Sequence, residues 1–286
     1  MNISILSGKG GTGKTTLSTN FAGVADDAVL IDCDIEEPNA HLFFTTEITE
    51  SKPLFVGFPE IDNGLCIHCR KCAEFCRFHA IIAGPKVTLP LKELCHDCGG
   101  CALVCPAGAV TFGRRKIGTV NTCSIAGGKT LIYGVLDTGE LSGVHIIEEV
   151  KRSADGRGST VLTDCPPGTS CSTVAALEKT DYCVIVSEPT PFGVSDMKMV
   201  VELLKSLDIP FGVVVNKAGI GNRELFDYCG KERIAILGEI PFDMELARAY
   251  AEGTPAYSAS SEYREAFDRL WSAVLSKARE AVHGRT

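Results

Sequence analysis

The chain has 286 residues, of which 45% are hydrophobic, so it is long and apolar enough to bury one large core or two modest ones. Its formal net charge of −8 disfavours nucleic acid as the main partner, because phosphate binding needs a surplus of basic side chains on one face. The N-terminus has no basic segment before a long apolar run, and no stretch reaches about 18 apolar residues. We therefore expect a cytoplasmic protein without a stable membrane anchor.

A phosphate-binding loop follows the first predicted strand, Ile3 to Leu6. Four residues of this loop match the pattern G-x-x-x-x-G-K-S/T, in which glycines let backbone N–H groups converge on a polyphosphate. The lysine of the pattern meets the terminal phosphate charges, and the hydroxyl after it ligates Mg²⁺. A helix from about Thr15 to Val24 would add its N-terminal dipole. The predicted ATP-binding residues are Gly8, Gly10, Gly11, Thr12, Gly13, Lys14, Thr15 and Thr16, with Thr15 also on Mg²⁺.

The next predicted strand, Val29 to Cys33, ends in two carboxylates. Asp32 and Asp34 are two residues apart, so both face the same side of an extended strand. They lie at the carboxyl end of the strand, where ligands bind in open parallel sheets. This position makes Asp34 a candidate catalytic residue, although an aspartate here also suits a turn or a helix cap.

Fourteen cysteines in a chain without a secretory leader point to metal binding rather than to disulfides. Eight of them form two runs with the same 3, 3, 4 spacing: Cys66, Cys69, Cys72 and Cys76, then Cys95, Cys98, Cys101 and Cys105. At this spacing three thiolates bind one [4Fe–4S] cluster and the fourth reaches another cluster. We therefore expect one cluster on Cys66, Cys69, Cys72 and Cys105 and a second on Cys95, Cys98, Cys101 and Cys76.

Zinc is the alternative for these cysteines, because four thiolates also suit Zn²⁺. Two adjacent runs of identical spacing fit clusters better. The nearby His68, His79 and His96 are expected to be loop residues that tune hydrogen bonds, since the thiolates already complete both ligand sets.

The remainder of the chain alternates predicted strands and helices. A buried strand from Ser159 to Asp164 ends in a carboxylate followed by Pro-Pro-Gly, and another from Phe211 to Val215 runs into Asn216 and Lys217. Other strands are expected at 129–136, 181–187 and 236–240, and helices at 143–153, 191–207, 244–252 and 262–283. The alternation predicts an α/β fold with a Rossmann-like parallel sheet. Residues 1–57 and 117–286 would form the P-loop domain, and residues 58–116 a small inserted α+β domain.

The second lysine of the phosphate loop, Lys9, gives the chain a family resemblance. A Lys-Gly-Gly-x-Gly-Lys-Thr-Thr loop resembles the deviant Walker A motif of the MinD, ParA, Mrp and nitrogenase iron-protein superfamily, and the likeness covers essentially the whole chain. It implies that Lys9 crosses a homodimer interface to the partner's phosphates and that Asp34 positions the attacking water. It further implies that Asp164 holds Mg²⁺ through water and that Gly168 senses the γ-phosphate. In the family pattern the base is contacted by Asn216, Lys217, Pro241 and Phe242.

The inserted segment resembles a bacterial two-cluster ferredoxin. It departs from the ferredoxin pattern at Arg77, where proline would follow the first run as Pro106 follows the second. Cys171 lies seven residues beyond Asp164, the offset of a cysteine that helps bridge two subunits through one cluster in the nitrogenase iron protein. Cys123 is a possible companion for it, and a small buried residue at a helix start is the alternative for Cys171.

Together these features predict a Mg-dependent ATPase with two [4Fe–4S] clusters, in which ATP-driven dimer closure is coupled to redox chemistry or electron transfer. Lys9 and Lys14 would stabilise charge on the transferring phosphoryl group. The alternatives are an Mrp-like iron–sulfur cluster carrier and a MinD-like positioning ATPase. The sequence does not identify the protein that would accept electrons or clusters.

Overall fold

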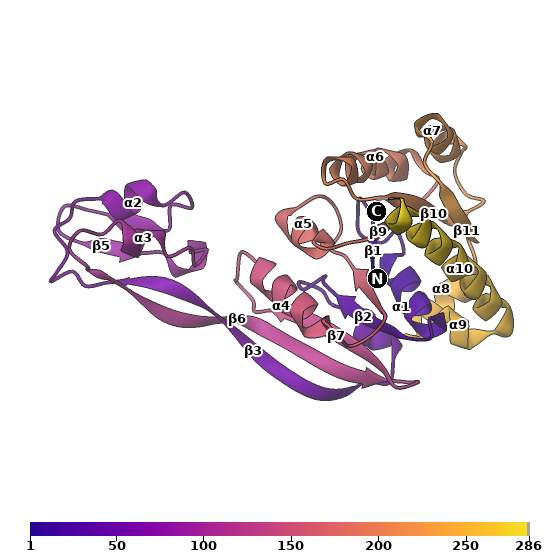
Figure 1. Ribbon diagram of the computed structural model, residues 1–286, viewed down its shortest axis with the longest axis horizontal. Coiled ribbons are helices and arrows are strands. Elements are labelled where there is room, and N and C mark those ends of the chain that lie inside the picture. The colour runs from indigo at the N-terminus through magenta and orange to yellow at the C-terminus, as the bar shows by residue number, and fades with distance from the viewer. Residues whose placement is uncertain (285–286) are drawn as a thin grey trace. The chain divides into compact units, whose positions relative to one another are not determined.

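The computed structural model of the protein describes residues 1–284, which fall into two compact units. The first unit comprises residues 1–51, 120–135 and 147–286, and the second comprises residues 52–119 and 136–146. Figure 1 shows the elements of each. The second unit contains the whole segment 58–116 in which the sequence places an inserted domain, together with the residues that flank it.

A mixed β-sheet forms the centre of the first unit, with the strand order β11-β10-β9-β1-β8-β2-β7-β6-β3. The strands from β11 to β7 pair in parallel, as the sequence predicts. These strands are β1 (Asn2–Leu6), β2 (Ala28–Asp32), β7 (Lys129–Leu136), β8 (Thr160–Asp164), β9 (Tyr182–Ser187), β10 (Phe211–Ala218) and β11 (Ile236–Pro241). The β-branched and leucine residues of the central strands β1, β2, β9 and β10 are almost wholly buried, as expected for strands covered on both faces, whereas Ile236 of the edge strand β11 is exposed.

Two strands were not predicted, and they make the sheet mixed rather than parallel. They are β3 (Glu47–Ile61) and β6 (Val110–Ile125), each of which begins in one unit and ends in the other. β6 is joined to its neighbour β7 through Gly127 and Gly128, with φ angles of 81° and 72°, and a Gly-Gly connection of this kind reverses the chain. The interruption of the first unit is therefore a pair of long strands, and it starts about ten residues before Gly57.

Helices cover both faces of the sheet. On one face α1 (Lys14–Val24) and α10 (Ser261–His283) pack over the strands, and the rings of Phe21 and Trp271 lie 5.1 Å apart between these helices. Figure 1 places α4 (Val144–Ala154), α5 (Cys171–Leu177) and α6 (Pro191–Ser206) on the other face. The remaining helices of this unit are η1 (Ala40–Phe43), α7 (Glu224–Glu232), α8 (Met244–Ala251) and α9 (Ala256–Ala259).

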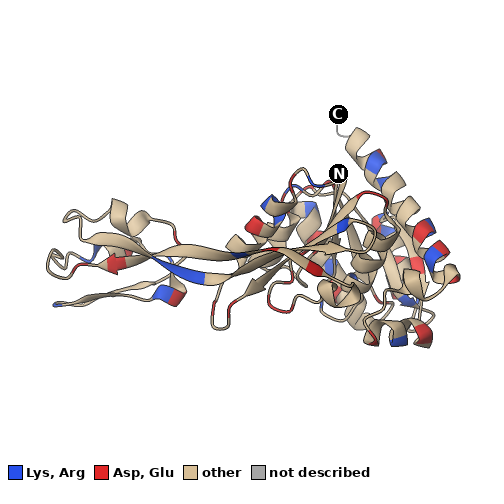
Figure 2. Cartoon of the chain, turned by 90° about the horizontal axis from the view of Figure 1, so that it is seen from below, with Lys and Arg blue, Asp and Glu red and all other residues tan. Residues whose placement is uncertain are grey.

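The predicted helices and strands of the first unit are present, with ends displaced by only a few residues. The sequence analysis missed η1, α7 and α9 and anticipated only the start of α5 at Cys171, because these helices are short. Figure 2 shows charges of both signs along α10, whose apolar residues are buried in the core. Within residues 1–284, no helix combines the length and the apolar character that crossing a membrane requires.

The second unit contains little regular structure. Beyond the outer parts of β3 and β6 it holds α2 (Lys71–Phe75), α3 (Gly100–Leu103), η2 (Lys92–Leu94) and the antiparallel pair β4 (Ile81–Ala83) and β5 (Thr88–Pro90). Only a few of its apolar side chains are buried, among them Ala80, Ile81 and Ala109. Small units with so little core usually depend on bound metal or disulfides for stability.

Candidate functional site

The loop after β1 presents free backbone N–H groups at the start of a helix. Gly11 and Gly13 adopt positive φ angles of 76° and 100°, and α1 begins at Lys14 without a side-chain cap. An uncapped helix start attracts anions because its N–H groups and dipole both favour negative charge. Lys14 is only 7% exposed, so its ammonium group lies within the loop rather than in bulk water. The segment therefore has the geometry of a phosphate site.

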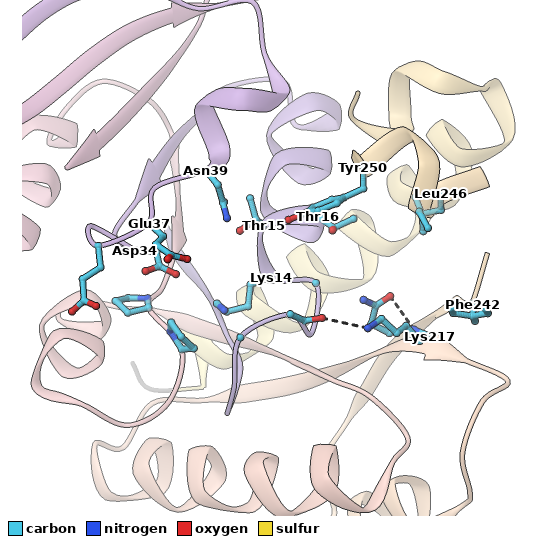
Figure 3. Close-up of a pocket in the computed structure, with 18 of the residues that line it drawn as sticks. Lys14, Thr15, Thr16, Asp34, Glu37, Asn39, Lys217, Phe242, Leu246 and Tyr250 are labelled. Atoms are coloured by element: carbon cyan, nitrogen blue, oxygen red, sulfur yellow. Dashed lines mark hydrogen bonds between the residues drawn. The ribbon is translucent and has the colours of Figure 1, made fainter. Parts of the chain in front are cut away.

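This loop opens into a cavity of about 790 Å³, within the range of roughly 300–1,000 Å³ that small-molecule sites occupy. Of the residues predicted from the sequence, the cavity is lined by Gly10, Gly11, Gly13, Lys14, Thr15, Thr16, Asp34, Asn216, Lys217, Pro241 and Phe242. Gly8, Lys9, Thr12, Asp164 and Gly168 are not among its lining residues. Figure 3 shows Asp34 and Glu37 on one side of Lys14, and Phe242 and Leu246 on the other.

Two buried carboxylates end neighbouring strands, although neither lines the cavity. Asp32 and Asp164 end the neighbouring parallel strands β2 and β8 in register, and both are at most 1% exposed. Asp32 accepts hydrogen bonds from the backbone N–H groups of Asp34, Asn39 and Ala40, each at 3.0 Å. Burial, and then the neighbouring Asp164, raise the pKa of Asp32 to about 8. Asp32 thus fixes the loop between β2 and η1 rather than facing a ligand.

Asp164 has the features of a metal-binding carboxylate. Its Oδ2 accepts a hydrogen bond from the Ser18 hydroxyl at 3.0 Å, but its buried Oδ1 has no partner among the described residues. Burial raises the pKa of Asp164 to about 6, against the opposing effects of the Lys14 ammonium and a hydrogen bond from Thr15. A buried carboxylate with an unpaired oxygen beside a threonine hydroxyl fits Mg²⁺, which prefers oxygen ligands and retains bound water.

Asp34 lies beside the phosphate loop, at the end of the segment that Asp32 holds. Its pKa is raised by burial, whereas the Lys14 ammonium acts in the opposite direction. Asp34 lines the cavity together with Glu36 and Glu37, which were not predicted as site residues. The carboxylate is therefore placed near the phosphates that the loop would hold, with Lys14 as its nearest counter-charge.

Glu188 joins two of the predicted lysines, and the sequence analysis did not single it out. It is 8% exposed, its Oε1 lies 2.5 Å from Lys217 Nζ, and its Oε2 lies 3.9 Å from Lys9 Nζ. The contact with Lys9 is long and that side chain is 39% exposed, so Glu188 holds Lys217 far more firmly. In the single chain Lys9 therefore remains near the surface of the phosphate loop.

Asn216 is bound to the phosphate loop in this structure. Its Nδ2 donates to the Thr12 carbonyl at 2.7 Å, and its Oδ1 accepts from the Lys217 backbone N–H at 2.9 Å. The amide predicted to contact the base thus couples β10 to the loop. Apolar contacts in this half of the cavity come from Phe242, Leu246 and Tyr250. The last two lie on α8, and only the amphipathic character of that segment could have suggested them.

Gly168 lies in the Pro-Pro-Gly turn after β8 and contacts the phosphate loop. Its backbone N–H donates to the Ser7 carbonyl at 2.9 Å, and its φ angle of 83° favours glycine. The turn and the loop are therefore hydrogen-bonded neighbours, although Gly168 itself does not line the cavity.

The eight cysteines of the two runs line two small cavities in the second unit, and each cavity takes one cysteine from the other run. The first is lined by Cys66, Cys69, Cys72 and Cys105, and the second by Cys76, Cys95, Cys98 and Cys101. Burial raises the pKa of Cys72, with further effects from its neighbours Cys66 and Cys105, and burial raises the pKa of Cys101 to about 11. The exchange of Cys76 and Cys105 is the arrangement that the spacing predicts.

The two cysteine runs also share a backbone conformation. The residues one before and one after the second cysteine of each run have left-handed φ angles: 54° and 66° at His68 and Arg70, and 52° and 72° at Asp97 and Gly99. The last cysteine of each run accepts a backbone N–H from four residues ahead, at 3.3 Å for Cys76 and 3.4 Å for Cys105. Arg77 leaves this pattern intact. A left-handed φ angle costs free energy in residues other than glycine. Its recurrence at the same positions of both runs shows that the two runs adopt the same loop conformation.

No group of three or more His, Cys, Asp or Glu side chains within residues 1–284 is placed to hold a single metal ion. The histidines near the runs include His96, which stacks on Phe78 with ring centroids 3.7 Å apart. Cys123 and Cys171 do not form a pair. Cys123 is 1% exposed in the hydrophobic core, whereas Cys171 is exposed at the first position of α5. The alternative of a small buried residue at Cys171 is correct about the helix start but wrong about burial.

Known proteins resemble this chain along most of its length. It is 30% identical over 258 residues to the uncharacterized protein MJ0579 of Methanocaldococcus jannaschii, covering 88% of this chain and 90% of that protein. It is 23% identical to an iron-sulfur cluster carrier protein of the same organism, covering 96% of this chain and 84% of that one. The septum site-determining protein MinD of Pyrococcus horikoshii, solved with Mg-ADP, shares the fold with a TM-score of 0.55 at 20% identity, covering 94% and 93% of the two chains.

The phosphate loop, the in-register carboxylates and the parallel sheet agree with a match that spans most of the chain. Residues 3–256 match the CobQ/CobB/MinD/ParA nucleotide-binding domain, and the chain belongs to this family of P-loop nucleotide-binding ATPases.

Proposed function

We propose that this protein is a Mg-dependent ATPase that carries two [4Fe–4S] clusters and couples nucleotide-driven dimer closure to their redox chemistry. The observation that carries the proposal is the pair of cysteine-lined cavities, each with four thiols drawn from both runs, in a chain that also has a phosphate loop. Residues 58–116 are then an inserted two-cluster ferredoxin domain within a P-loop domain of residues 1–57 and 117–286.

In the nucleotide site, catalysis rests on position and charge. Lys14 and the N–H groups at the start of α1 bind the phosphates, and Thr15 and Asp164 hold Mg²⁺, the latter through water. Asp34 orients the attacking water beside the terminal phosphate. Phe242 packs against the base, together with the apolar residues of α8. Bound Mg²⁺ supplies positive charge at the β- and γ-phosphates.

In the second unit, the donor set fits iron–sulfur clusters. Four sulfur donors at each cavity, with the fourth exchanged between two runs of identical spacing, suit two [4Fe–4S] clusters better than two zinc sites of four cysteines each. Bound clusters would supply one-electron redox chemistry and would tie together a unit that has little core of its own. Backbone N–H groups, those of Ala80 and Ala109, donate hydrogen bonds to the sulfur atoms of Cys76 and Cys105.

A packed route leads from the nucleotide site to the strands that carry the second unit. Asp32 holds the backbone at Ala40, the next residue His41 stacks on Tyr133 of β7, and β7 is the neighbour of β6. β6 continues from the first unit into the second. These contacts join the loop that contains Asp34 to β7, and β7 lies beside the strand that continues into the second unit.

Dimerisation on ATP belongs to the same proposal. Lys9 is partly exposed beside the phosphate loop and has only a long contact with Glu188, so it is free to reach the phosphates bound by a second copy. Closure over two nucleotides would bring two copies of that lysine into the two sites.

Cluster carriage is a second candidate, supported by the likeness to an iron-sulfur cluster carrier and by the exposed Cys171. A carrier needs accessible, shareable thiols, and Cys171 has no thiol companion in Cys123, which is buried. Transfer of iron and sulfide from the loaded protein to an apoferredoxin, faster than their release to a chelator, would favour carriage over redox coupling.

The deciding experiment is an EPR redox titration of the anaerobic protein without nucleotide, with ADP and with a non-hydrolysable ATP analogue. We expect two [4Fe–4S] signals, and a change in their potentials or magnetic coupling when the ATP analogue is bound. Two signals whose potentials and magnetic coupling do not change with nucleotide would contradict the coupling of ATP binding to the clusters. Two zinc sites in place of iron would contradict the cluster assignment itself.

A further inference from the structure

The two cysteine-lined cavities differ in the charge beside their exposed thiols. Each cavity has one exposed cysteine, Cys69 in the first and Cys98 in the second. Cys69 is followed directly by two exposed basic residues, Arg70 and Lys71, whereas Cys98 follows Asp97 and precedes two glycines. Two basic residues therefore follow the exposed thiol of the first cavity directly, whereas no basic residue is next in sequence to the exposed thiol of the second.

The basic side chains at the first cavity are not neutralised by the chain itself. Among residues 1–284, no carboxylate forms an ion pair with Arg70 or Lys71. The segment from Cys66 to His79 carries three basic residues and a single acidic one, Glu74, in a protein whose net charge is −8. Arg70 and Lys71 are therefore available to a partner of opposite charge.

Apolar side chains lie next to these charges. Leu65 is 57% exposed and Ile67 is 65% exposed, and Ile67 lines the first cavity together with Cys69 and Arg70. An apolar centre with a charged rim is the usual composition of a protein interface. Complexes between redox proteins use small interfaces of this kind, and their encounter is steered by charge.

We propose that Leu65, Ile67, Arg70 and Lys71, here called the basic face, form the docking site of an acidic protein electron carrier that exchanges electrons with the first cavity. The proposal rests on the proposed function, because it requires a redox cluster on Cys66, Cys69, Cys72 and Cys105. In the exchange the reduced carrier loses one electron and the cluster gains it, and no bond or proton is transferred.

The test is the rate at which a reduced plant-type ferredoxin, an acidic one-electron donor, reduces the loaded protein in anaerobic stopped-flow experiments at low and high salt. The test variant is Arg70→Gln/Lys71→Gln. The matched control is Lys86→Gln/Arg114→Gln, which removes one lysine and one arginine of the same unit that do not line the first cavity. Dithionite reduction and the EPR signals report whether both clusters are present.

We expect the test variant to lose about tenfold in rate at low salt and most of its salt dependence, and the control to stay within about twofold of the wild type. A changed cluster potential alone would leave the salt dependence intact. Equal rates in the test variant and the wild type, or an equal loss in the control, would overturn the docking site while leaving the clusters in place. If the reconstituted protein showed no cluster EPR signals, the proposed function would be overturned as well.

Discussion

The imidazole ring of His41 stacks on the phenol ring of Tyr133, with ring centroids 4.8 Å apart and planes inclined by 15°. One ring follows the loop that Asp32 anchors at the nucleotide site, and the other lies on β7, beside the strand that leads into the second unit. Under the proposed function, the stack is therefore the contact through which a change in the nucleotide loop would act on β7.

Replacing His41 by alanine should weaken this coupling. We expect His41→Ala to reduce the nucleotide-dependent change in the cluster potentials by half or more, because the loop loses its contact with β7. His41→Phe retains an aromatic ring and should retain most of the change. EPR titration with and without the ATP analogue measures both variants, and equal coupling in His41→Ala and the wild type would exclude this route.

The same histidine predicts a dependence of stability on pH. Burial lowers the pKa of His41 below its ordinary value of 6.5, so the unfolded chain binds a proton more readily than the folded protein does. The free energy of unfolding should therefore decrease as the pH falls through about 6.5 towards the folded-state pKa. His41→Phe removes this group, so its urea midpoint relative to the wild type should rise between pH 7.5 and pH 5.5. A constant difference would show that His41 titrates as an exposed histidine.

Lys14 should be indispensable for hydrolysis. It is buried at the start of α1 and lines the cavity, so Lys14→Ala should lower ATP turnover by at least about 100-fold. Both cluster signals should remain, because the cysteines lie in the other unit. Phosphate release and iron content measured on one preparation test both statements, and unchanged turnover would exclude the assignment.

Lys9 should behave differently from Lys14. Lys9→Ala removes only a 3.9 Å contact with Glu188 from a partly exposed side chain, so stability should change by less than about 1 kcal/mol. If this lysine acts in the partner's site, the variant should still bind nucleotide but should fail to dimerise on the ATP analogue. Sedimentation velocity with the analogue measures this, and Lys217→Ala serves as a comparison that breaks the shorter contact with Glu188.

The parts of the site that sequence analysis predicted are those encoded in short segments. The phosphate loop and the cysteine runs are local patterns, and the exchange of Cys76 and Cys105 follows from their spacing. Glu188 and Tyr250 were missed because each reaches the site from a distant element and carries no motif. The sequence placed Asp32 at the end of a strand but could not predict its hydrogen bonds. Its partners at Asn39 and Ala40 depend on how the following loop folds.

The sequence analysis also predicted a wholly parallel sheet and did not anticipate β3 and β6. Two signals for these strands were present. Gly127 and Gly128 form a reverse turn before β7, and the segment 110–125 is rich in threonine, valine and isoleucine. The predicted inserted domain began after Gly57 because its bounds were set around the cysteine pattern, although the strand that leads into the second unit begins at Glu47.

Asp34 should affect chemistry more than binding. Its carboxylate lies beside Lys14 but is not part of the backbone cradle that would bind the phosphates, so Asp34→Asn should keep the ADP dissociation constant within about threefold. Hydrolysis should fall by about 100-fold, because the attacking water loses its acceptor. Glu37→Gln alters a neighbouring carboxylate of the same cavity and should have a much smaller effect. A comparable loss in both variants would indicate a general electrostatic role in place of a specific one.

Exchange of the fourth ligand between the two cysteine runs gives the most discriminating prediction. Cys105 lines the cavity of Cys66, Cys69 and Cys72, and Cys76 lines the other cavity. Cys105→Ala should therefore damage the first cluster and Cys76→Ala the second, each leaving about half of the iron. Cys171→Ser, at an exposed thiol outside both cavities, should retain all of it. The two cluster variants should then lose different EPR signals, because each signal belongs to a cavity and not to a run. If both variants lost the same signal, or if Cys105→Ala affected the cluster of its own run, the exchange would be wrong and each run would bind its metal separately.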